Sequence, residues 1–364
     1  MRKLLILSFV FLIFVEAFSV SAEAAFNGIS LINTELFGLT SAEKDVWKID
    51  STSEKPVLTA TTTQPTIIRT TTQFGKFDID IDYTLSKGGK ASLLIKTDPK
   101  GLRCLEIPLD DTESMDALQS VSLPNEQINK TSKYGRGFIG VKLYQGTIRI
   151  GALTVKPVLS QKLFNGKDLG NWKTHDVIDA GVNENGELTV KNGNGSLESA
   201  LRYGDFNLSL DVYVNGEGLN SGVFFRCIPG EKMNGYECQV HFGFLDGDRT
   251  KPQDCGTGGI FRRVNARKVI GNDKEWVNVY INAVGNHFSV WVNGEQVSDW
   301  TDTRKLDPNP RRGLRLDHGT IQLQGHDATS DFKFRNIAIE EIPVREKITP
   351  PPILQKRRSA SPLP

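Results

Sequence analysis

Short runs in which apolar and polar residues alternate dominate this chain, and Gly, Asn and Asp separate them. Clear examples are LNSGVFFR at 219–226, GYECQVH at 235–241 and GTIQLQGHD at 319–327. A period of two residues is typical of a strand that buries one face and exposes the other. Runs with a helical period are hard to find. The pattern therefore predicts an all-β chain.

The alternation assigns the side chains of these runs to two faces of a sheet. In the run 219–226, Val223 and Phe225 share one face, so Phe224 and Arg226 should share the other. The same count over the other two runs adds further polar residues to the outer face: Glu237, Gln239, His241, Gln322, Gln324 and His326. We therefore expect a row of polar side chains that faces away from the core.

One β-rich unit occurs twice along the chain. QFGKFDIDIDYTL at 73–85 is matched by RYGDFNLSLDVYV at 202–214, and KASLLIKT at 90–97 by NSGVFFRC at 220–227. The match continues in the same order with 103–107 on 237–241 and with 136–150 on 311–323. A preserved order favours a true repeat. The predicted units are residues 26–157 and 160–343.

The two predicted copies differ at the polar row. The alignment places Arg103, Leu105 and Ile107 where the second copy has Glu237, Gln239 and His241, and the first copy lacks an insert over 241–300. We therefore expect the first copy to be degenerate and non-catalytic.

Both ends of the chain predict segments outside these units. Basic residues, the apolar run Leu4–Phe18 and small residues up to Ala25 have the pattern of a secretory signal, so residues 1–24 are expected to be a signal peptide and the protein to be secreted or periplasmic. No later segment is apolar enough to span a membrane. Three consecutive prolines and a basic run predict a disordered tail over 344–364.

The net charge of the chain argues against nucleic acid as a partner. The formal net charge is +1. The chain therefore has no global electrostatic attraction for nucleic acid.

Export would permit disulfides among the four cysteines. Cys227 and Cys238 lie in neighbouring predicted strands, so they are a candidate pair, and Cys238 with Cys255 is the rival. Cys104 has no evident partner. Four buried thiols are an equally good interpretation.

The alternating pattern does not by itself predict a metal site. Because residues two apart in a strand lie roughly 6.6 Å apart, Glu237 and His241 would lie about 13 Å apart at Cα and could not bind one ion by themselves. A metal would need a further ligand, such as Asp246, Asp248 or His326. A divalent metal therefore stays an open alternative.

Several motifs together resemble the 3-keto-disaccharide hydrolase domain family, formerly a domain of unknown function, which belongs with the concanavalin A-like lectin/glucanase sandwiches. The motifs are LFNGKDL at 163–169 with Trp172, NSGVFFR at 220–226, GYECQ at 235–239, GHD at 325–327 and FRNI at 334–337. The resemblance covers about 163–343. It implies two facing antiparallel sheets, and with the repeat it predicts two concanavalin-like (jelly-roll) β-sandwich domains in tandem.

The resemblance also implies action on glycosides oxidised at C3. A C3 ketone acidifies the C2 hydrogen, so a base can remove that proton, the C1 substituent can leave, and water can add. The motif match assigns Glu237 as the base or a metal ligand, Arg226 to the ketone oxygen, and His241 or His326 as the acid or a ligand. Candidate sugar-binding residues are Gln239, Asn220, Arg262, Gln324 and Trp300.

Two other interpretations remain open. The chain could be a non-catalytic carbohydrate-binding, lectin-like module, because related sandwiches bind sugars on this face. It could also be a structural protein of the cell envelope. For single residues, Arg226, Arg262 and Glu237 could form a surface ion-pair network, and Trp300 could be a core aromatic.

Overall fold

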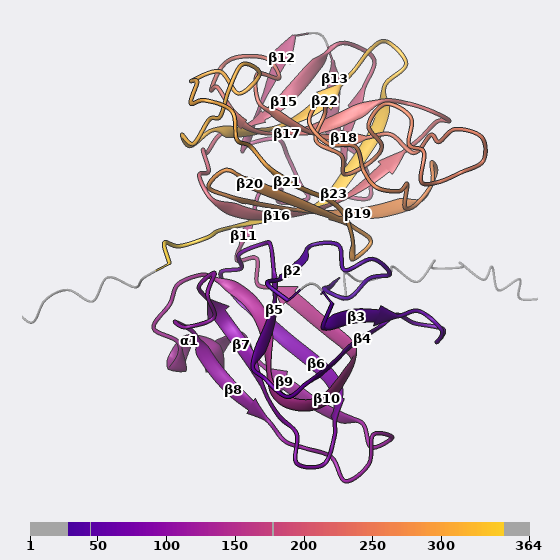
Figure 1. The fold of residues 1–364 in the computed structure, drawn as a ribbon. Helices are drawn as coiled ribbons and strands as arrows, with labels where there is room; N and C mark the ends of the chain where they lie inside the picture. The colour runs from indigo at the N-terminus through magenta and orange to yellow at the C-terminus, as the bar shows by residue number, and fades with distance from the viewer. Residues whose placement is uncertain (1–27, 44, 177, 346–364) are drawn as a thin grey trace, which may run out of the picture.

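The computed structural model describes residues 28–43, 45–176 and 178–345, which form two β-sandwiches, one above the other (Figure 1). The all-β prediction is confirmed: strands dominate both. The predicted signal peptide and nearly all of the predicted tail lie outside the described residues. Across the described part of the chain, no helix has the length and apolar character needed to cross a bilayer.

The downstream sandwich consists of two antiparallel sheets, which we call its front and back sheets. The order of the front sheet is β12 (Trp172–Asp176), β15 (Gly195–Ser199), β22 (Thr320–Gly325), β17 (Ser221–Cys227) and β18 (Tyr236–Val240). The order of the back sheet is β13 (Asp179–Val182), β14 (Leu188–Lys191), β23 (Asp331–Glu341), β16 (Phe206–Val214), β19 (Trp276–Val284), β20 (His287–Val292) and β21 (Glu295–Thr301), with β11 (Gln161–Lys162) beside β23.

Apolar residues of both sheets fill the space between them. Val223 and Phe225 of β17 point into this core, as their alternation predicts, and Phe225 packs edge-on against Phe206 and Phe288 of the back sheet. Burial of these side chains stabilises the sandwich by about 1.5–3 kcal/mol each. The polar residues between them are thereby turned toward the outside of the front sheet.

The upstream sandwich is built around one long strand, β10 (Phe138–Pro157). Its first half pairs with β5 (Thr66–Thr70) and β7 (Lys90–Thr97), and its second half with β4 (Val57–Thr62) and β6 (Phe77–Leu85). Gly146, at φ 95°, lies where the strand passes from one sheet to the other. The remaining elements are β1 (Ile29–Ser30), β2 (Leu39–Ser41), β3 (Trp47–Asp50), β8 (Leu105–Leu109), β9 (Gln119–Leu123) and α1 (Asn125–Thr131).

The strand pairings of the two sandwiches match. β7 pairs with β8 and the first half of β10, as β17 pairs with β18 and β22. β6 pairs with β9 and the second half of β10, as β16 pairs with β19 and β23. The single strand β10 thus corresponds to two strands, β22 and β23, of the downstream copy.

The structure corrects the sequence alignment of the copies in two places. Phe74 bridges Gly137 as Tyr203 bridges Gly319, so Gly137 and not Gly146 is the counterpart of Gly319. Glu106 lies opposite Leu94 as Glu237 lies opposite Phe224. The counterpart of Glu237 is therefore Glu106, where the alignment had placed Arg103. The connection from Leu94 to Glu106 is one residue shorter than that from Phe224 to Glu237, whereas the alignment required a difference of four residues.

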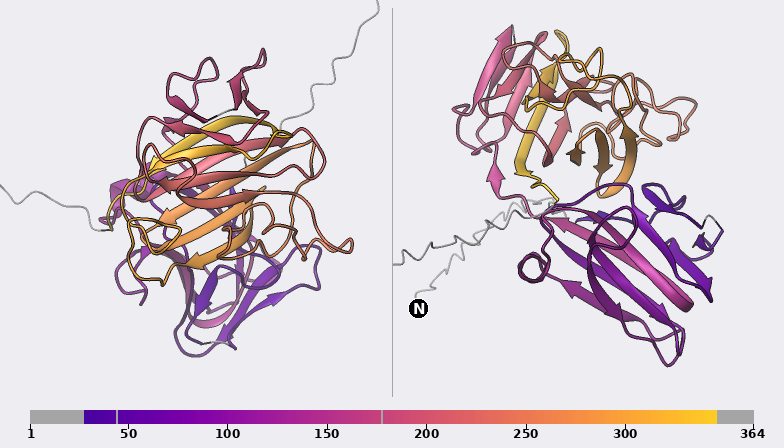
Figure 2. Two further views of the ribbon diagram at one scale, coloured as in Figure 1. Left: turned by 90° about the horizontal axis from the view of Figure 1, so that it is seen from above. Right: turned by 60° about the vertical axis from the view of Figure 1, so that its left-hand side comes forward.

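The upstream sandwich covers the outer face of the downstream back sheet (Figures 1 and 2). Tyr280 and Trp291 project from β19 and β20 into the upstream core, where the ring of Trp291 lies 6.2 Å from that of Phe74. Hydrogen bonds join Thr72 to Ser289 at 2.7 Å and Asn282 to the carbonyl of Gln73 at 3.0 Å. The upstream sandwich does not cover the front sheet, whose strands β15, β17, β18 and β22 are nevertheless buried within the downstream sandwich.

The start of the predicted tail also contacts the upstream sandwich. Arg345 donates hydrogen bonds to the carbonyl oxygens of Lys96, Thr97, Arg136 and Arg103. Its guanidinium group lies 4.4 Å from the ring centroid of Tyr134. The prediction of a disordered tail is therefore wrong for Arg345.

Replacing Trp291 should uncouple the two sandwiches. The side chain is 1% exposed, so Trp291→Ala is expected to cost about 3–5 kcal/mol and to split one calorimetric unfolding transition into two. Trp276→Ala, a half-buried residue on the same sheet outside both cores, is the control and should keep one transition. One unchanged transition in Trp291→Ala would contradict the coupling.

Candidate functional site

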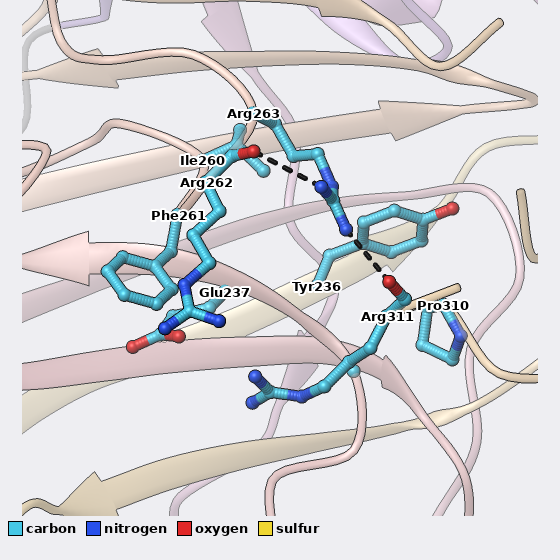
Figure 3. A pocket seen from close by; sticks show the side chains of 9 residues that line it. Tyr236, Glu237, Ile260, Phe261, Arg262, Arg263, Pro310 and Arg311 are labelled. Atoms are coloured by element: carbon cyan, nitrogen blue, oxygen red, sulfur yellow. Dashed lines mark hydrogen bonds between the residues drawn. The ribbon is translucent and has the colours of Figure 1, made fainter. Parts of the chain in front are cut away.

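A pocket of about 180 Å³ opens on the outer face of the downstream front sheet. Its polar lining comes from β18, β22 and the neighbouring loops: Asn220, Glu237, Gln239, Asp254, Arg311, Gln324 and His326. A smaller hollow of about 70 Å³ adjoins it, shares Glu237 and adds Arg262 and Arg263 (Figure 3). The two hollows meet at the carboxyl group of Glu237.

Glu237 is buried without a hydrogen-bond donor for its carboxylate. The residue is 9% exposed, and within the described residues its side chain makes no hydrogen bond or ion pair. Burial raises the pKa of Glu237 to about 7; Asp254 adds to the rise, and the positive charges of Arg311, His326 and Arg262 oppose it. A carboxyl group with such a pKa can accept or donate a proton near neutral pH.

Gly222 provides the space that this carboxyl group occupies. It lies on β17 opposite Gln239 of β18, next to Phe224. A Cβ atom at position 222 would lie 2.9 Å from Oε1 of Glu237 and 3.0 Å from the ring of Phe224. Glycine thus leaves the room that the carboxyl group of Glu237 occupies, and a larger side chain at position 222 would displace that group.

Two arginines bring positive charge to the pocket. Arg311 donates through Nη2 to the carbonyl of Met233 at 2.8 Å, and its guanidinium lies 5.7 Å from the ring centroid of Phe224. Arg262 lies over the ring of Phe261 at 5.2 Å. Figure 3 shows both side chains reaching toward the carboxylate of Glu237. An anion that forms beside Glu237 would meet these two groups.

Amide groups form the floor of the pocket. Gln239 donates through Nε2 to Asn220 at 3.0 Å and to Asp254 at 3.1 Å, and Asn220 also donates to Asp254. The side-chain oxygens of Gln239 and Gln324 are buried and have no hydrogen-bond partner among the described residues. Buried acceptors without a donor are costly, so they suit a ligand with hydroxyl groups.

A buried network behind the pocket holds Arg311 in place. Glu198 accepts hydrogen bonds from Thr320 at 2.6 Å, His175 at 2.6 Å and the backbone of Gly230 at 3.1 Å. Burial raises the pKa of Glu198, but these hydrogen bonds outweigh it and the net shift is downward. The carboxylate thus fixes the loop 228–235, whose Met233 carbonyl binds Arg311.

Arg226 does not reach this pocket, and the prediction that it faces outward is wrong. Its φ is 49°, and a bulge interrupts the pairing of β17 with β22 between Phe224 and Cys227. The side chain is 0% exposed and donates to the carbonyls of Gly204, Gly285 and Arg315. An ion pair with Asp205 at 2.9 Å completes its contacts. Arg226 is therefore structural.

Two further candidates lie elsewhere. His241 accepts a hydrogen bond at Nδ1 from the backbone of Gly243 and does not line either hollow. Trp300 packs against Tyr236 and Phe288 at the edge of the core, with ring centroids 6.3 and 5.7 Å away. The structure therefore places Trp300 with the core rather than in the sugar-binding row.

The candidate metal ligands do not come together. Asp246 and Asp248 lie in a loop, where both face Lys251, whereas Glu237 and His326 line the pocket. Nδ1 of His326 lies 2.9 Å from the carboxylate of Asp327. No group of three or more His, Cys, Asp or Glu side chains in the described segments is placed to hold a metal ion.

The predicted disulfide is absent. All four cysteines are free, and the strand register places Cys238 opposite Val223, so Cys227 lies further along β17. Both thiols are fully buried, Cys238 in the core between the sheets and Cys227 beside Phe224 and Met233. Burial raises the pKa of both thiols. Of the two interpretations of the cysteines, that of buried thiols agrees with the structure.

Sequence reasoning missed Arg311, Asp254 and Glu198. Arg311 and Asp254 lie in loops, where no alternation assigns a face. Glu198 lies in β15, in the run GSLES at 195–199. It pairs with Gln322 on the front sheet, and this pairing would have placed Glu198 beside the polar row.

Comparisons with known proteins cover half of the chain. Residues 160–340 match the model of the 3-keto-alpha-glucoside-1,2-lyase-like domain. No curated protein sequence matches the chain. Two candidate glycosyl hydrolases from Parabacteroides distasonis are similar in structure, at 22% and 26% identity and TM-scores of 0.41 and 0.39. Each covers 50% of this chain, over 93% and 98% of its own length.

The carbohydrate-binding module CBM66 from Bacillus subtilis is also similar. Its identity is 17%, its TM-score is 0.36, and the match covers 50% of this chain and 100% of the module.

The two arginines predicted for the site should behave differently when replaced. Arg226→Gln removes the partner of Asp205 and of three carbonyl groups, so it is expected to lower the free energy of unfolding by about 3–5 kcal/mol. Arg262→Gln changes a more exposed side chain and should cost less than about 1 kcal/mol. Urea unfolding measures both, and an unchanged midpoint in Arg226→Gln would contradict its structural role.

Proposed function

Residues 160–340 belong to the family of 3-keto-alpha-glucoside-1,2-lyase-like domains, and on this premise we propose that the downstream sandwich cleaves glycosides oxidised at C3. The single observation that carries the proposal is Glu237: a buried carboxyl group, with a pKa of about 7 and no hydrogen-bond donor among the described residues, in a pocket lined by arginines. Supporting observations are the unsatisfied amide oxygens of the pocket floor.

The reaction begins with proton transfer from C2 to the carboxylate of Glu237. The electron pair of the C2–H bond forms an enediolate with the C3 oxygen, and Arg262 and Arg311 stabilise its negative charge. The enediolate then collapses: the C3 carbonyl reforms, a double bond forms between C1 and C2, and the C1–O bond to the aglycone breaks. A proton from His326 neutralises the leaving oxygen.

Water then adds to the C1–C2 double bond. Its oxygen joins C1 while one of its protons passes to His326, and a proton returns to C2 from Glu237. Both side chains are thereby restored, and the free 3-keto sugar is formed. The sum is a hydrolysis carried out through elimination and hydration. The amide groups of Asn220, Gln239 and Gln324 orient the hydroxyl groups of the sugar during both steps.

Glu237→Gln should greatly slow turnover, while Glu217→Gln, which changes an exposed residue outside the pocket, should not. Loss of the base is expected to lower kcat/KM for 3-keto-sucrose by about 10²–10⁴-fold. In the parent protein, kcat/KM should rise as pH increases through about 7, because Glu237 acts as the deprotonated base. A primary isotope effect with C2-deuterated substrate checks the proton transfer.

Saturable binding of the sugar without any turnover would refute this proposal and would identify a carbohydrate-binding module instead. Equal turnover by Glu237→Gln and Glu217→Gln would refute the role of Glu237 alone.

The raised pKa of Glu237 also predicts a stability change with pH. The unfolded chain ionises this carboxyl near 4.5 but the folded protein only near 7, so folding stability falls between these values and stays lower above them. The loss corresponds to roughly 3 kcal/mol. Glu237→Gln removes this loss, so the free energy of unfolding of the variant should rise relative to that of the parent between about pH 4 and pH 8, as measured by urea unfolding. A difference between the two proteins that does not change with pH would contradict the burial of a titrating carboxyl group.

A further inference from the structure

A second hollow lies on the upstream sandwich, on the sheet that corresponds to the site-bearing front sheet. It has a volume of about 520 Å³ and is lined by residues of β2, β5, β10 and the loop after β7. This volume is in the range of ligand-binding pockets, roughly 300–1,000 Å³. We propose that this upstream hollow binds an anionic saccharide, one that carries carboxylate or sulfate groups.

Strand register shows how the charge of this face has changed between the copies. In the upstream sheet, Gly140 lies between Arg69 and Leu94 of the neighbouring strands. In the downstream sheet, Gln322 lies in the same way between Glu198 and Phe224. Arg69 therefore takes the place of the buried acid Glu198. By the same register Lys142 takes the place of Gln324. An acid and an amide are thus replaced by two cations.

The cations of the hollow make no ion pair among the described residues, although the carboxylates of Asp98 and Glu106 attract Arg69 and Lys142. Arg69 donates through Nε to the carbonyl of Pro99 at 3.1 Å and through Nη1 to that of Thr70 at 2.9 Å, which leaves Nη2 without a partner in the described structure. Lys100 and Lys142 make no ion pair among the described residues, and both line the hollow. Three positive charges therefore face one space.

The carboxylates nearby are already engaged. Glu43 lines the hollow, and its Oε2 accepts hydrogen bonds from Thr66 at 2.9 Å and Ser41 at 3.3 Å. Asp98 lies close to Arg69 but accepts from the backbone of Leu102 at 2.8 Å and from Arg103 at 3.3 Å. The balance in the hollow remains positive, which favours an anionic ligand.

The aromatic rings beside the hollow are covered by two of its cations. The guanidinium of Arg69 lies 4.3 Å from the ring centroid of Phe138, and Lys142 lies 4.4 Å from that of Tyr144. Because cations cover these rings, they offer no free platform for stacked bases or for the apolar face of a neutral sugar. Hydroxyl groups of Thr40 and Ser41 line the hollow beside the cations and suit a hydroxylated, charged ligand.

Binding is tested with the full chain by affinity electrophoresis at fixed ionic strength. The probes are polygalacturonate for carboxylates and dextran sulfate for sulfates, with neutral dextran as the reference. Retardation by either charged polymer is expected, and the stronger one identifies the anionic group. Inorganic sulfate at equal charge should not displace the polymer. No retardation by either charged polymer, equal retardation by neutral dextran, or displacement by inorganic sulfate would overturn the proposal.

A matched pair of double variants separates this site from general charge. Lys100→Ala/Lys142→Ala removes two cations of the hollow that make no hydrogen bond in the described residues, and it should weaken binding at least tenfold. Lys48→Ala/Lys55→Ala removes two exposed lysines elsewhere on the same sandwich and should stay within twofold of the parent. Equal weakening in both pairs would overturn the proposal. The result does not depend on turnover by the downstream site, so the two proposals fail separately.

Discussion

The downstream site depends on the cost of burying one carboxyl group without a hydrogen-bond donor. Water would solvate Glu237 if the face of the front sheet were flat, and a nearby donor would hold its pKa low. Neither occurs, because the missing side chain of Gly222 sets the group into the sheet and the surrounding arginines act at a distance. The network of Glu198 behind the pocket fixes one of those arginines. Burial at this place therefore leaves a carboxyl group that can exchange a proton near neutral pH.

The strand alternation predicted the all-β fold and the outward direction of Glu237, Gln239 and Gln324, because these residues lie in regular strands. It failed at Arg226, where a left-handed backbone conformation and a bulge turn the side chain away from the face that the alternation assigns to it. Nothing in the local pattern marks such a reversal. Arg311 was missed for a different reason: a loop has no period, and the contacts that bring it to the pocket come from the carbonyl of Met233 and the ring of Phe224.

The two copies show how a site can arise from one interruption of a strand. β10 runs unbroken through both sheets of the upstream sandwich. In the downstream copy the corresponding chain is divided into β22 and β23, and the segment between them contains His326, which lines the pocket. The long strand has no such segment, and its outer face carries lysine and glycine where β22 carries glutamine. Similar backbones therefore present different chemistry on equivalent sheets.

The docking of Arg345 has a mechanical consequence. The downstream sandwich is joined to its neighbour at its beginning by the covalent connection before β11 and at its end by this arginine, which is held by several carbonyl groups. A body tethered at two points can rotate only about the line between them, and the packed back sheet opposes even that rotation. A hinge motion between the sandwiches is therefore opposed, and any change of shape at the pocket must arise within the downstream sandwich itself.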